Sequence, residues 1–454
     1  MASRADQMAS NISLANFAQA TELKKRLLFT LGALIIFRLL SYVPLPGVDP
    51  TVLGLLSQHT QGGVLDFFNT FSGGSLKRMS ITALGVMPYI TASIVVQLGT
   101  SLSPALAAIK KEGESGRMRL NQYTRYGTVA LTAIQGYFIA AGLEALGANQ
   151  GVQAIVVPGM LFRLTAVVSL IGGTMFLMWL GEQITSRGIG NGVSLIIMAG
   201  IIASMPTQII NLLQGGRTGS MSTLNIILIV VAVVGLVLFI CFMELAQRRI
   251  LIQYPKRQTQ RGMQAERSHL PLKLNTAGVI PPIFASSLLL MPLTVSQFAG
   301  QHIAGQSWWG DMIITLNQYL QHGSPLYMLL YGAGIIFFSF FYTAVVFNPE
   351  ETAENLKRHG GFIPGIRPGK NTEVYFDYVL TRITVVGALY LAVICLVPEY
   401  LVTALSIPFY LGGTSLLIVV NVTMDTVTQI QSHLLAHQYG DLIKKAKLKG
   451  NRLR

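Results

Sequence analysis

Residues Val64 to Gln97 read VLDFFNTFSGGSLKRMSITALGVMPYITASIVVQ, which joins a short amphipathic segment to a long apolar one. The first segment, Val64 to Phe71, is too short to cross a bilayer, because a spanning helix needs about 20 residues. Gly73 and Gly74 then allow the backbone to turn, and an uncharged run long enough to span begins at Met79. A broken helix at membrane depth is stable only where protein buries it or where it lines a watery cavity. The segment therefore indicates either a pore or binding site, or an extracytoplasmic loop that folds back for packing.

The composition of the whole chain is that of a polytopic membrane protein. Of its 454 residues, 51% are hydrophobic and only 11% are charged, against roughly 25% charged residues in soluble domains. Ten charge-poor apolar stretches follow one another, and we expect each to cross the membrane. They are centred near Ile35, Ile90, Leu131, Ser169, Ile197, Val231, Ser287, Phe338, Tyr390 and Leu417.

The positive charge lies on one side of these ten spans. If the spans alternate in direction, all but five of the 33 lysines and arginines fall on a single face. The five exceptions are Arg38, Lys77, Arg78, Arg163 and Arg217. Because lysine and arginine accumulate in cytoplasmic loops, and because an even number of spans returns the chain to its starting side, both termini are expected to be cytoplasmic.

Two of the basic loops, at about residues 245–274 and 348–379, are longer than a connection between helices requires. Basic residues beside a membrane often serve only orientation and attraction to anionic lipid. The second loop, however, contains FIPGIRPG, in which two Pro-Gly pairs stiffen a turn around Arg367. A single arginine at the tip of such a turn favours docking of a soluble partner.

Signatures of catalysis and of cofactor binding are missing from the sequence. The run Gly188 to Gly192 lacks the spacing of a phosphate-binding loop and is expected to be a tight turn with close packing. His433 and His437 have a spacing that can chelate a metal on a helix, but no third ligand is evident. Cys241 and Cys395 lie far apart inside apolar runs. We therefore expect no enzyme activity, no cofactor and no metal.

The acidic residues help to separate a channel from a coupled transporter. Transporters driven by protons commonly bury acidic or histidine side chains in the middle of their spans, whereas Glu182, Glu244, Glu399 and Asp425 fall near the ends of theirs. This distribution favours a channel. An inverted-repeat secondary transporter remains the alternative, because broken helices and two five-span halves are also typical of that class.

Ten strings of the sequence, in order from about Leu23 to Gly450, resemble the bacterial SecY family, the channel subunit of the Sec protein-secretion translocon. They are GALIIFRLLSYVPLPGVD, FNTFSGGSLKRMSITALGVMPYITASI, IKKEGESGR, QYTRYGT, GTMFLMWLGEQIT, RGIGNG, HLPLKLNTAGVIPPIFASS, FFYTAVVFNPEETAENLK, PGIRPG and GGTSLLIVV. The resemblance implies a protein-conducting channel of the bacterial inner membrane. It translocates unfolded secretory polypeptides and releases hydrophobic segments laterally into the lipid.

The resemblance also implies an all-α architecture, with ten transmembrane helices in two inverted five-helix halves that form an hourglass channel. Spans one to five fall in residues 23–213 and spans six to ten in residues 214–435, between cytoplasmic tails 1–22 and 436–454. Residues 64–75 correspond to a plug that closes the extracytoplasmic funnel. The lateral gate lies between spans two and three on one side and spans seven and eight on the other.

Motif matching carries three groups of residues over from the family. The pore ring falls on Val86, Ile90, Val193, Ile197, Ile283 and Ile418, with valine at two positions where isoleucine is common. The plug includes Val64, Leu65, Phe67, Phe68, Phe71, Gly73 and Gly74. Docking of the motor or ribosome falls on Lys256, Arg257, Arg261 and Arg367, with Gly262 where some members have a second arginine. The implied partners are the SecE and SecG subunits, the SecA motor ATPase, the ribosome, signal sequences, unfolded precursors and membrane lipid.

Overall fold

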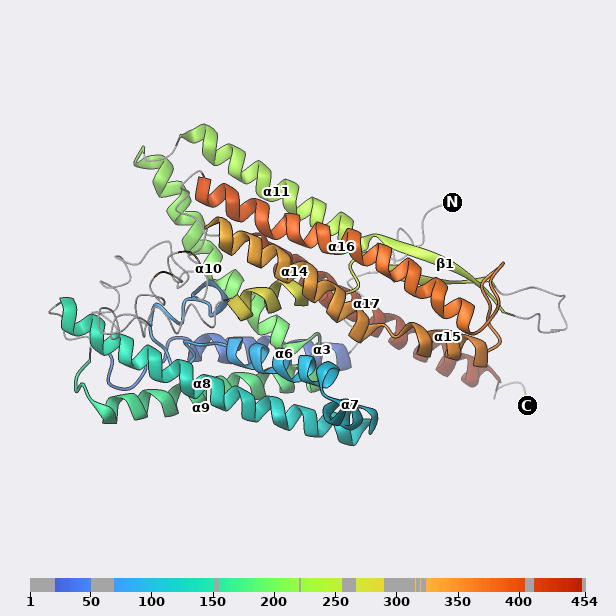
Figure 1. Ribbon diagram of the computed structural model, residues 1–454, viewed down its shortest axis with the longest axis horizontal. Helices are drawn as coiled ribbons and strands as arrows, with labels where there is room; N and C mark the ends of the chain where they lie inside the picture. The colour runs from blue at the N-terminus through green and yellow to red at the C-terminus, as the bar shows by residue number, and fades with distance from the viewer. Residues whose placement is uncertain are drawn as a thin grey trace.

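A computed structural model describes residues 21–49, 69–150, 155–219, 222–254, 267–289, 315, 319, 324–404 and 412–450 (Figure 1). Its longer helices are α3 (Thr21–Leu40), α6 (Met87–Leu102), α7 (Pro104–Lys111), α8 (Glu114–Gln150), α9 (Met160–Arg187), α10 (Gly192–Arg217), α11 (Thr223–Leu245), α14 (Pro325–Val346), α15 (Pro349–Arg358), α16 (Lys370–Ala404) and α17 (Gly413–Gly450). A shorter apolar helix covers Ile280–Leu289. Each of the ten predicted span centres lies inside one of these helices, and the prediction of an all-α membrane protein is confirmed.

Not every one of these helices is apolar enough to count as a span by itself. Within the described residues, 6 helices are long and apolar enough to cross a membrane, and α6 with α7 makes a seventh that is bent by 99°. Helix α3 falls outside this group because its first turns carry Glu22, Lys24, Lys25 and Arg26. The predicted second span is therefore bent: the 16-residue helix α6 turns sharply into α7, whose lysines lie at its end.

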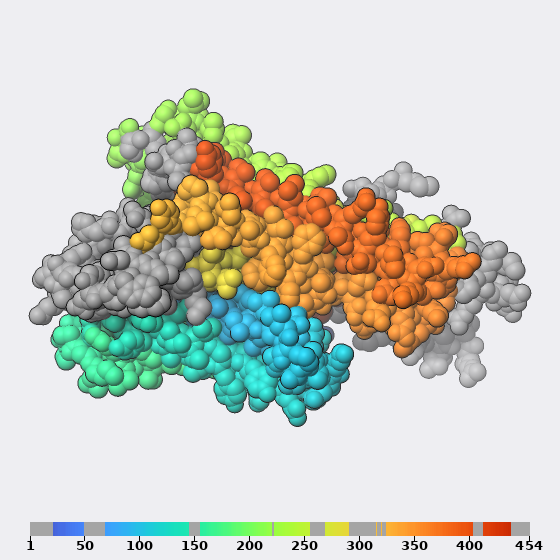
Figure 2. Space-filling view, in the orientation of Figure 1, coloured from blue at the N-terminus to red at the C-terminus, as the bar shows by residue number. Residues whose placement is uncertain are grey.

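The helices form two groups that follow the order of the chain. Helix α8 packs on α6 and α9, while α14 packs on α16, and α10 and α17 contact each other between the groups. Figure 2 shows the blue-to-cyan first group below the orange second group, with little mixing of the two. This is the arrangement that two five-helix halves would give, and the boundary near residue 214 stays a prediction.

The Gly188–Gly192 run is the tight turn that the sequence predicts. Gly190 has φ +86°, and a Cβ on Gly192 would lie 1.9 Å from the carbonyl oxygen of Gly181, so α9 and α10 meet there without room for a side chain. The Gly190 N–H donates to Oε1 of Gln429 in α17 at 2.8 Å. The turn therefore joins the first half of the chain to its last helix.

The two long basic loops fold together as one small unit with its own core. The first contains an antiparallel hairpin, β1 (Gln247–Gln253) and β2 (Arg267–Lys273), which the sequence prediction missed. The backbones of Gln253 and Phe362 exchange two hydrogen bonds of 2.9 Å, which tie the hairpin to the second loop. Apolar side chains from the hairpin, α15, the second loop and α16 complete the core: Ile250, Leu272, Ala353, Ile363, Phe376, Val379, Leu380 and Ile383. β1 and α15 lie together at one end of the molecule in Figure 1.

The beginning of α3 and the later part of α17 lie at the same end of the bundle. Leu23 near the start of α3 packs with Ile189 of the α9–α10 turn, and Ile430 and Leu434 of α17 pack against them. An even number of crossings produces this arrangement. The side of the membrane on which this end lies stays a prediction.

Candidate functional site

The end of the predicted plug is described, and its beginning is not. Val64, Leu65, Phe67 and Phe68 lie outside the described residues, whereas Phe71, Gly73 and Gly74 lie within them. The turn predicted at the glycine pair is present. Gly73 has φ +67° and Gly74 has φ +83°, values that residues with a Cβ rarely adopt.

This turn lies directly against helix α10. A Cβ on Gly73 would lie 3.1 Å from the Cα of Gly200, and a Cβ on Gly200 would lie 2.7 Å from the carbonyl oxygen of Phe71. Asn69 closes the turn, because its carbonyl oxygen accepts from the Gly74 N–H at 2.7 Å and its Oδ1 accepts from the Lys77 N–H at 3.0 Å. The contact between two backbones fixes this point of the chain on α10, and we call residues Asn69–Gly74 the plug root.

The segment after the plug root is not helical where the sequence predicted a helix. The uncharged run from Met79 was expected to be helical from its start, but α6 begins only at Met87 and residues 72–86 form turns. The reason is pairing with the chain that follows α3, since the Leu45 N–H donates to the Met79 carbonyl at 2.8 Å and the Ile81 N–H donates to the Val43 carbonyl at 3.1 Å. These bonds replace those that a helix would make.

The same segment also packs closely on α9. A Cβ on Gly173 would lie 2.0 Å from the Ile81 carbonyl oxygen, whereas a Cβ on the next glycine, Gly172, would meet nothing within 4 Å. Position 173 of α9 therefore has to be glycine for the segment before α6 to lie where it does.

We expect Gly173→Ala to destabilise the protein by about 1–3 kcal/mol, the usual cost of an added methyl group in a packed site. Gly172→Ala is the matched control and should be neutral or slightly stabilising, because alanine favours helix over glycine. The unfolding temperatures of the purified variants in detergent test this. Equal temperatures for the two variants would contradict the close packing at Gly173.

The six predicted ring residues come from four helices and share one apolar cluster. Val86 is the N-cap residue of α6 and Ile90 lies in its first turn, Val193 and Ile197 lie in α10, Ile283 in the helix Ile280–Leu289, and Ile418 in α17. Five of them are buried members of a cluster that runs through both halves, and Val193 is partly buried and packs against it. Val193 lies close to α9, since its Cγ2 would be 3.2 Å from a Cβ on Gly181. A set of β-branched side chains without a hydrogen-bonding group can exclude water and ions.

The two helices of the predicted lateral gate touch each other. Oγ of Ser287, in the helix Ile280–Leu289, lies 3.9 Å from Sδ of Met87 at the start of α6. This helix also packs on α14, where the ring of Phe284 meets those of Phe338 and Tyr342 edge to face. Here the hydroxyl of Ser287 in the second group of helices meets the flexible thioether of Met87 in the first group.

A buried amide fixes the beginning of the second gate helix. Asn275 donates from Nδ2 to Oε1 of Glu244 at the end of α11, at 2.7 Å, and its Oδ1 accepts from the Gly278 N–H at 3.1 Å. Gly278 has φ +65°, so the chain turns there and enters the helix at Ile280. Sequence reasoning missed Asn275, because its partner Glu244 lies 31 positions away.

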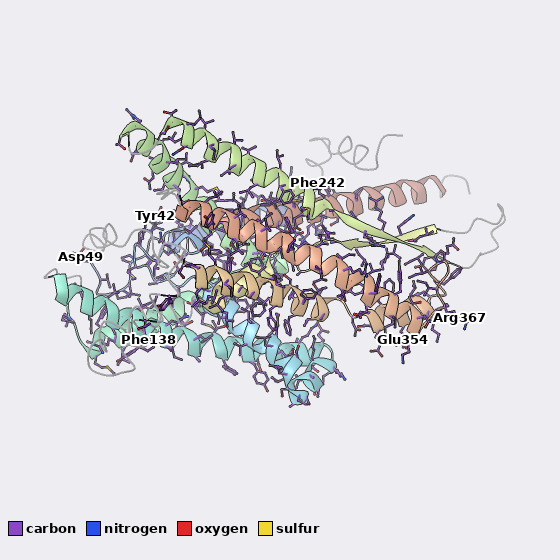
Figure 3. The ribbon with its side chains drawn as sticks, turned by 45° about the horizontal axis from the view of Figure 1, so that its top comes forward. Tyr42, Asp49, Phe138, Phe242, Glu354 and Arg367 are labelled. Atoms are coloured by element: carbon purple, nitrogen blue, oxygen red, sulfur yellow. The ribbon has the colours of Figure 1, made fainter. Side chains whose placement is uncertain are left out.

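Of the four predicted docking residues, only Arg367 lies within the described part of the chain. Lys256, Arg257 and Arg261 lie outside the described residues. Arg367 is exposed at the tip of the second loop, and Figure 3 shows it beside Glu354 at the end of the molecule that carries α15. Its carbonyl oxygen accepts from Oγ1 of Thr372 at 3.0 Å, so the backbone is held while the side chain is free to reach a partner.

Comparison with known proteins gives close relatives over almost the whole chain. Residues 80–427 match the model of the SecY family. The sequence is 54% identical to the protein translocase subunit SecY of Escherichia coli (strain K12), over 94% of this chain and 96% of that protein. It is 51% identical to the protein translocase subunit SecY of Rickettsia bellii (strain RML369-C), over 96% of this chain and 99% of that protein.

Solved structures share the fold at low sequence identity. A protein conducting channel matches with a TM-score of 0.63 at 16% identity, over 90% of this chain and 92% of that one. A SecY structure whose plug domain is reported to stabilise the closed state and maintain a membrane seal matches with a TM-score of 0.62 at 18% identity, over the same shares. Sec61 in the canine ribosome-channel complex matches with a TM-score of 0.60 at 14% identity.

Proposed function

This chain belongs to the SecY family, and we propose that it is the channel through which unfolded secretory polypeptides cross the bacterial inner membrane. Hydrophobic segments leave the same channel sideways into the lipid. The observation that carries this function is the 54% identity to a protein translocase subunit over nearly the entire chain. Family membership also decides against the secondary transporter that the sequence left open.

Within that function, residues 64–75 act as the plug and the six apolar side chains act as the ring. The close backbone contact between the plug root and α10 supports this assignment, because it holds the plug beside a helix that carries two ring residues. The Met87–Ser287 contact between two different groups of helices supports a gate that can part there.

The partners supply what this chain lacks. SecE and SecG complete the membrane complex, and the SecA motor or the ribosome docks on the basic cytoplasmic loops with both termini of this chain on the same side. The energy for transport comes from ATP or GTP hydrolysis by those partners. In this proposal the chain itself contributes the conduit, and the partners contribute the catalysis.

Reconstituted vesicles test the function directly. A channel should pass a secretory precursor into the vesicle when SecA and ATP are added, and should not accumulate small solutes without them. Solute uptake against a gradient, with no precursor transport, would overturn the proposal in favour of a transporter.

Arg367 provides a sharper test of docking. We expect Arg367→Glu to slow motor-driven translocation roughly tenfold at limiting SecA, because an exposed charge at a docking surface acts on association. Membrane insertion and assembly with the partner subunits should be unchanged. The matched control is Arg382→Glu, the same charge reversal at an exposed residue of α16 about 18 Å along the helix from Lys370. Native translocation by the Arg367→Glu channel, or an equal defect in the control, would remove Arg367 from the docking surface.

A further inference from the structure

Two arginines converge on a single carbonyl group at the plug root. Arg38, in the last turn of α3, donates from Nη1 to the Gly73 carbonyl oxygen at 2.6 Å. Arg78 donates from Nη2 to the same oxygen at 2.9 Å and from Nε to the Ser41 carbonyl at 3.2 Å. Both belong to the few basic residues that fall on the predicted extracytoplasmic side. The end of α3 and the plug root are thus joined by side chains that carry like charges.

This arrangement has an electrostatic cost. Burial, together with the neighbouring charge of Arg38, lowers the pKa of the Arg78 guanidinium below its usual value, while Tyr42 acts in the opposite direction. Within the part of the chain that the structure describes, neither arginine forms an ion pair with a carboxylate. Two cations that share one acceptor repel each other, so other contacts have to hold them together.

Tyr42 provides those contacts. The guanidinium carbons of Arg38 and Arg78 lie 4.9 and 4.3 Å from the centre of its ring, within the range of a cation–π interaction. The Tyr42 hydroxyl also accepts from Nη2 of Arg38 at 3.1 Å. Tyr42 is 57% exposed and follows the end of α3; Figure 3 labels it. One aromatic ring therefore stabilises both charges beside the carbonyl that they share.

The position of the Gly73 carbonyl in the chain indicates the role of Arg38 and Arg78, which both donate to it. On the C-terminal side of Gly74, the chain is fixed by the bonds of Met79 and Ile81 to the segment after α3. On the N-terminal side the plug begins. Within the described residues, Gly73 is therefore where Arg38 of the first helix holds the plug segment.

We propose that Arg38 and Arg78 form a latch that fixes the pivot of the plug at Gly73 and so keeps the resting channel closed. They are positioning residues, because they act on the plug and not on the translocated chain. This inference rests on the proposed role of residues 64–75 as the plug. A lysine cannot replace Arg78 in the latch, since a single ammonium group cannot donate to Gly73 and Ser41 from two edges of a planar fork.

The test measures resting ion currents of channels assembled with their partner subunits in planar bilayers. Arg38→Gln and Arg78→Gln are each expected to raise the frequency of spontaneous openings roughly tenfold, the effect of one lost charged hydrogen bond. The double variant should exceed the larger single effect only slightly, because both arginines serve one carbonyl. Arg78→Lys should fall between native and Arg78→Gln. Transport of a precursor with SecA and ATP should persist in all of them.

Arg217→Gln is the matched control, since Arg217 is exposed at the end of α10 and its removal changes the net charge equally. It should leave the resting current unchanged. Deleting residues 64–71 separates the two hypotheses. If the deletion leaks while the arginine variants stay closed, the latch is wrong and the plug stands. If the deletion also stays closed, the plug assignment itself is wrong.

If the double arginine variant does not assemble, Tyr42→Leu provides a second test of the latch. Tyr42→Leu changes an exposed side chain and removes the aromatic ring that holds the two cations together. Its channels should open severalfold more often than native ones. Native currents from Tyr42→Leu channels, or a double arginine variant whose effect is the full product of the two single effects, would overturn the latch.

Discussion

A channel in which Ile90, Ile197 and Ile418 are all replaced by serine is expected to conduct ions at rest roughly ten times more than the native channel. An apolar constriction holds ions back because an ion loses its hydration there and finds no polar group in exchange. Serine hydroxyls would supply that exchange and would also leave space for water. The three positions lie on three different helices, so the substitutions wet the ring from several sides.

Single-channel recording in a planar bilayer measures this effect, and neighbouring buried residues provide the controls. Ile196 and Leu417 are 2% and 0% exposed, as closely buried as the adjacent Ile197 and Ile418, which are 3% and 0% exposed. Serine at the control positions should destabilise the helices to a similar degree without raising the current. If the polar ring stayed closed to ions, or if the controls leaked equally, the assignment of these side chains to the seal would be abandoned.

The same recording separates the two layers of closure. Deleting Val64 to Phe71 while the ring is intact should give brief, flickering openings, because the ring still dewets between them. Combining the deletion with the serine ring should give long openings. This difference in duration distinguishes a seal made of two layers from one made by the plug alone.

A covalent link across the gate is expected to abolish the release of hydrophobic segments into lipid. Since Ser287 Oγ lies 3.9 Å from Met87 Sδ, cysteines at these two positions, in a background without Cys241 and Cys395, should be joined by a short bis-methanethiosulfonate crosslinker, whose disulfide bonds a reductant can cleave again. A segment of about 20 apolar residues gains enough from transfer into lipid to leave the pore sideways, but only if the two helices can part. Insertion of a signal sequence should fall to background when the link forms.

Reversal of the link and a matched pair within one half control for damage to the channel. The Ala92 Cβ lies 3.3 Å from the position of a Cβ on Gly127, so cysteines there can join α6 to α8 on the same side of the gate. That link should leave insertion intact. Restoring thiols at positions 87 and 287 should restore insertion. Normal release of apolar segments from a channel with the gate link formed would contradict the proposed exit path.

Local sequence patterns predicted the helices and the turns well. Apolar runs of spanning length predicted the positions of all ten span centres, because the length and hydrophobicity of a segment can be read from that segment alone. The glycine pair at Gly73 and the tip at Arg367 were predicted for the same reason, since each depends on neighbouring residues only. The family resemblance added the ring, which no local pattern could have indicated.

What the sequence did not predict depends on contacts between distant segments. Helix α6 begins at Met87 and not at Met79 because the backbone before it pairs with residues 43–45. The hairpin β1–β2 was missed because its strands are short and basic, and their stability comes partly from apolar residues of the second loop. The contact of Arg38 with Gly73 spans 35 positions. From the sequence alone, a single arginine near the end of an apolar helix indicates only a charge at the membrane surface.

The hairpin β1–β2 has a mechanical consequence. β1 starts two residues after α11 ends at Leu245, and β2 ends at Lys273, a few residues before the gate helix starts at Ile280. At its base, the Leu274 N–H donates to the Ala246 carbonyl at 2.9 Å, and a Cβ on Gly387 would lie 2.7 Å from the Leu274 carbonyl oxygen. Connections this short and this tightly packed transmit a displacement and do not absorb it. We therefore expect a displacement of the hairpin to be transmitted to the beginning of the predicted gate helix, with the hairpin turning about its base.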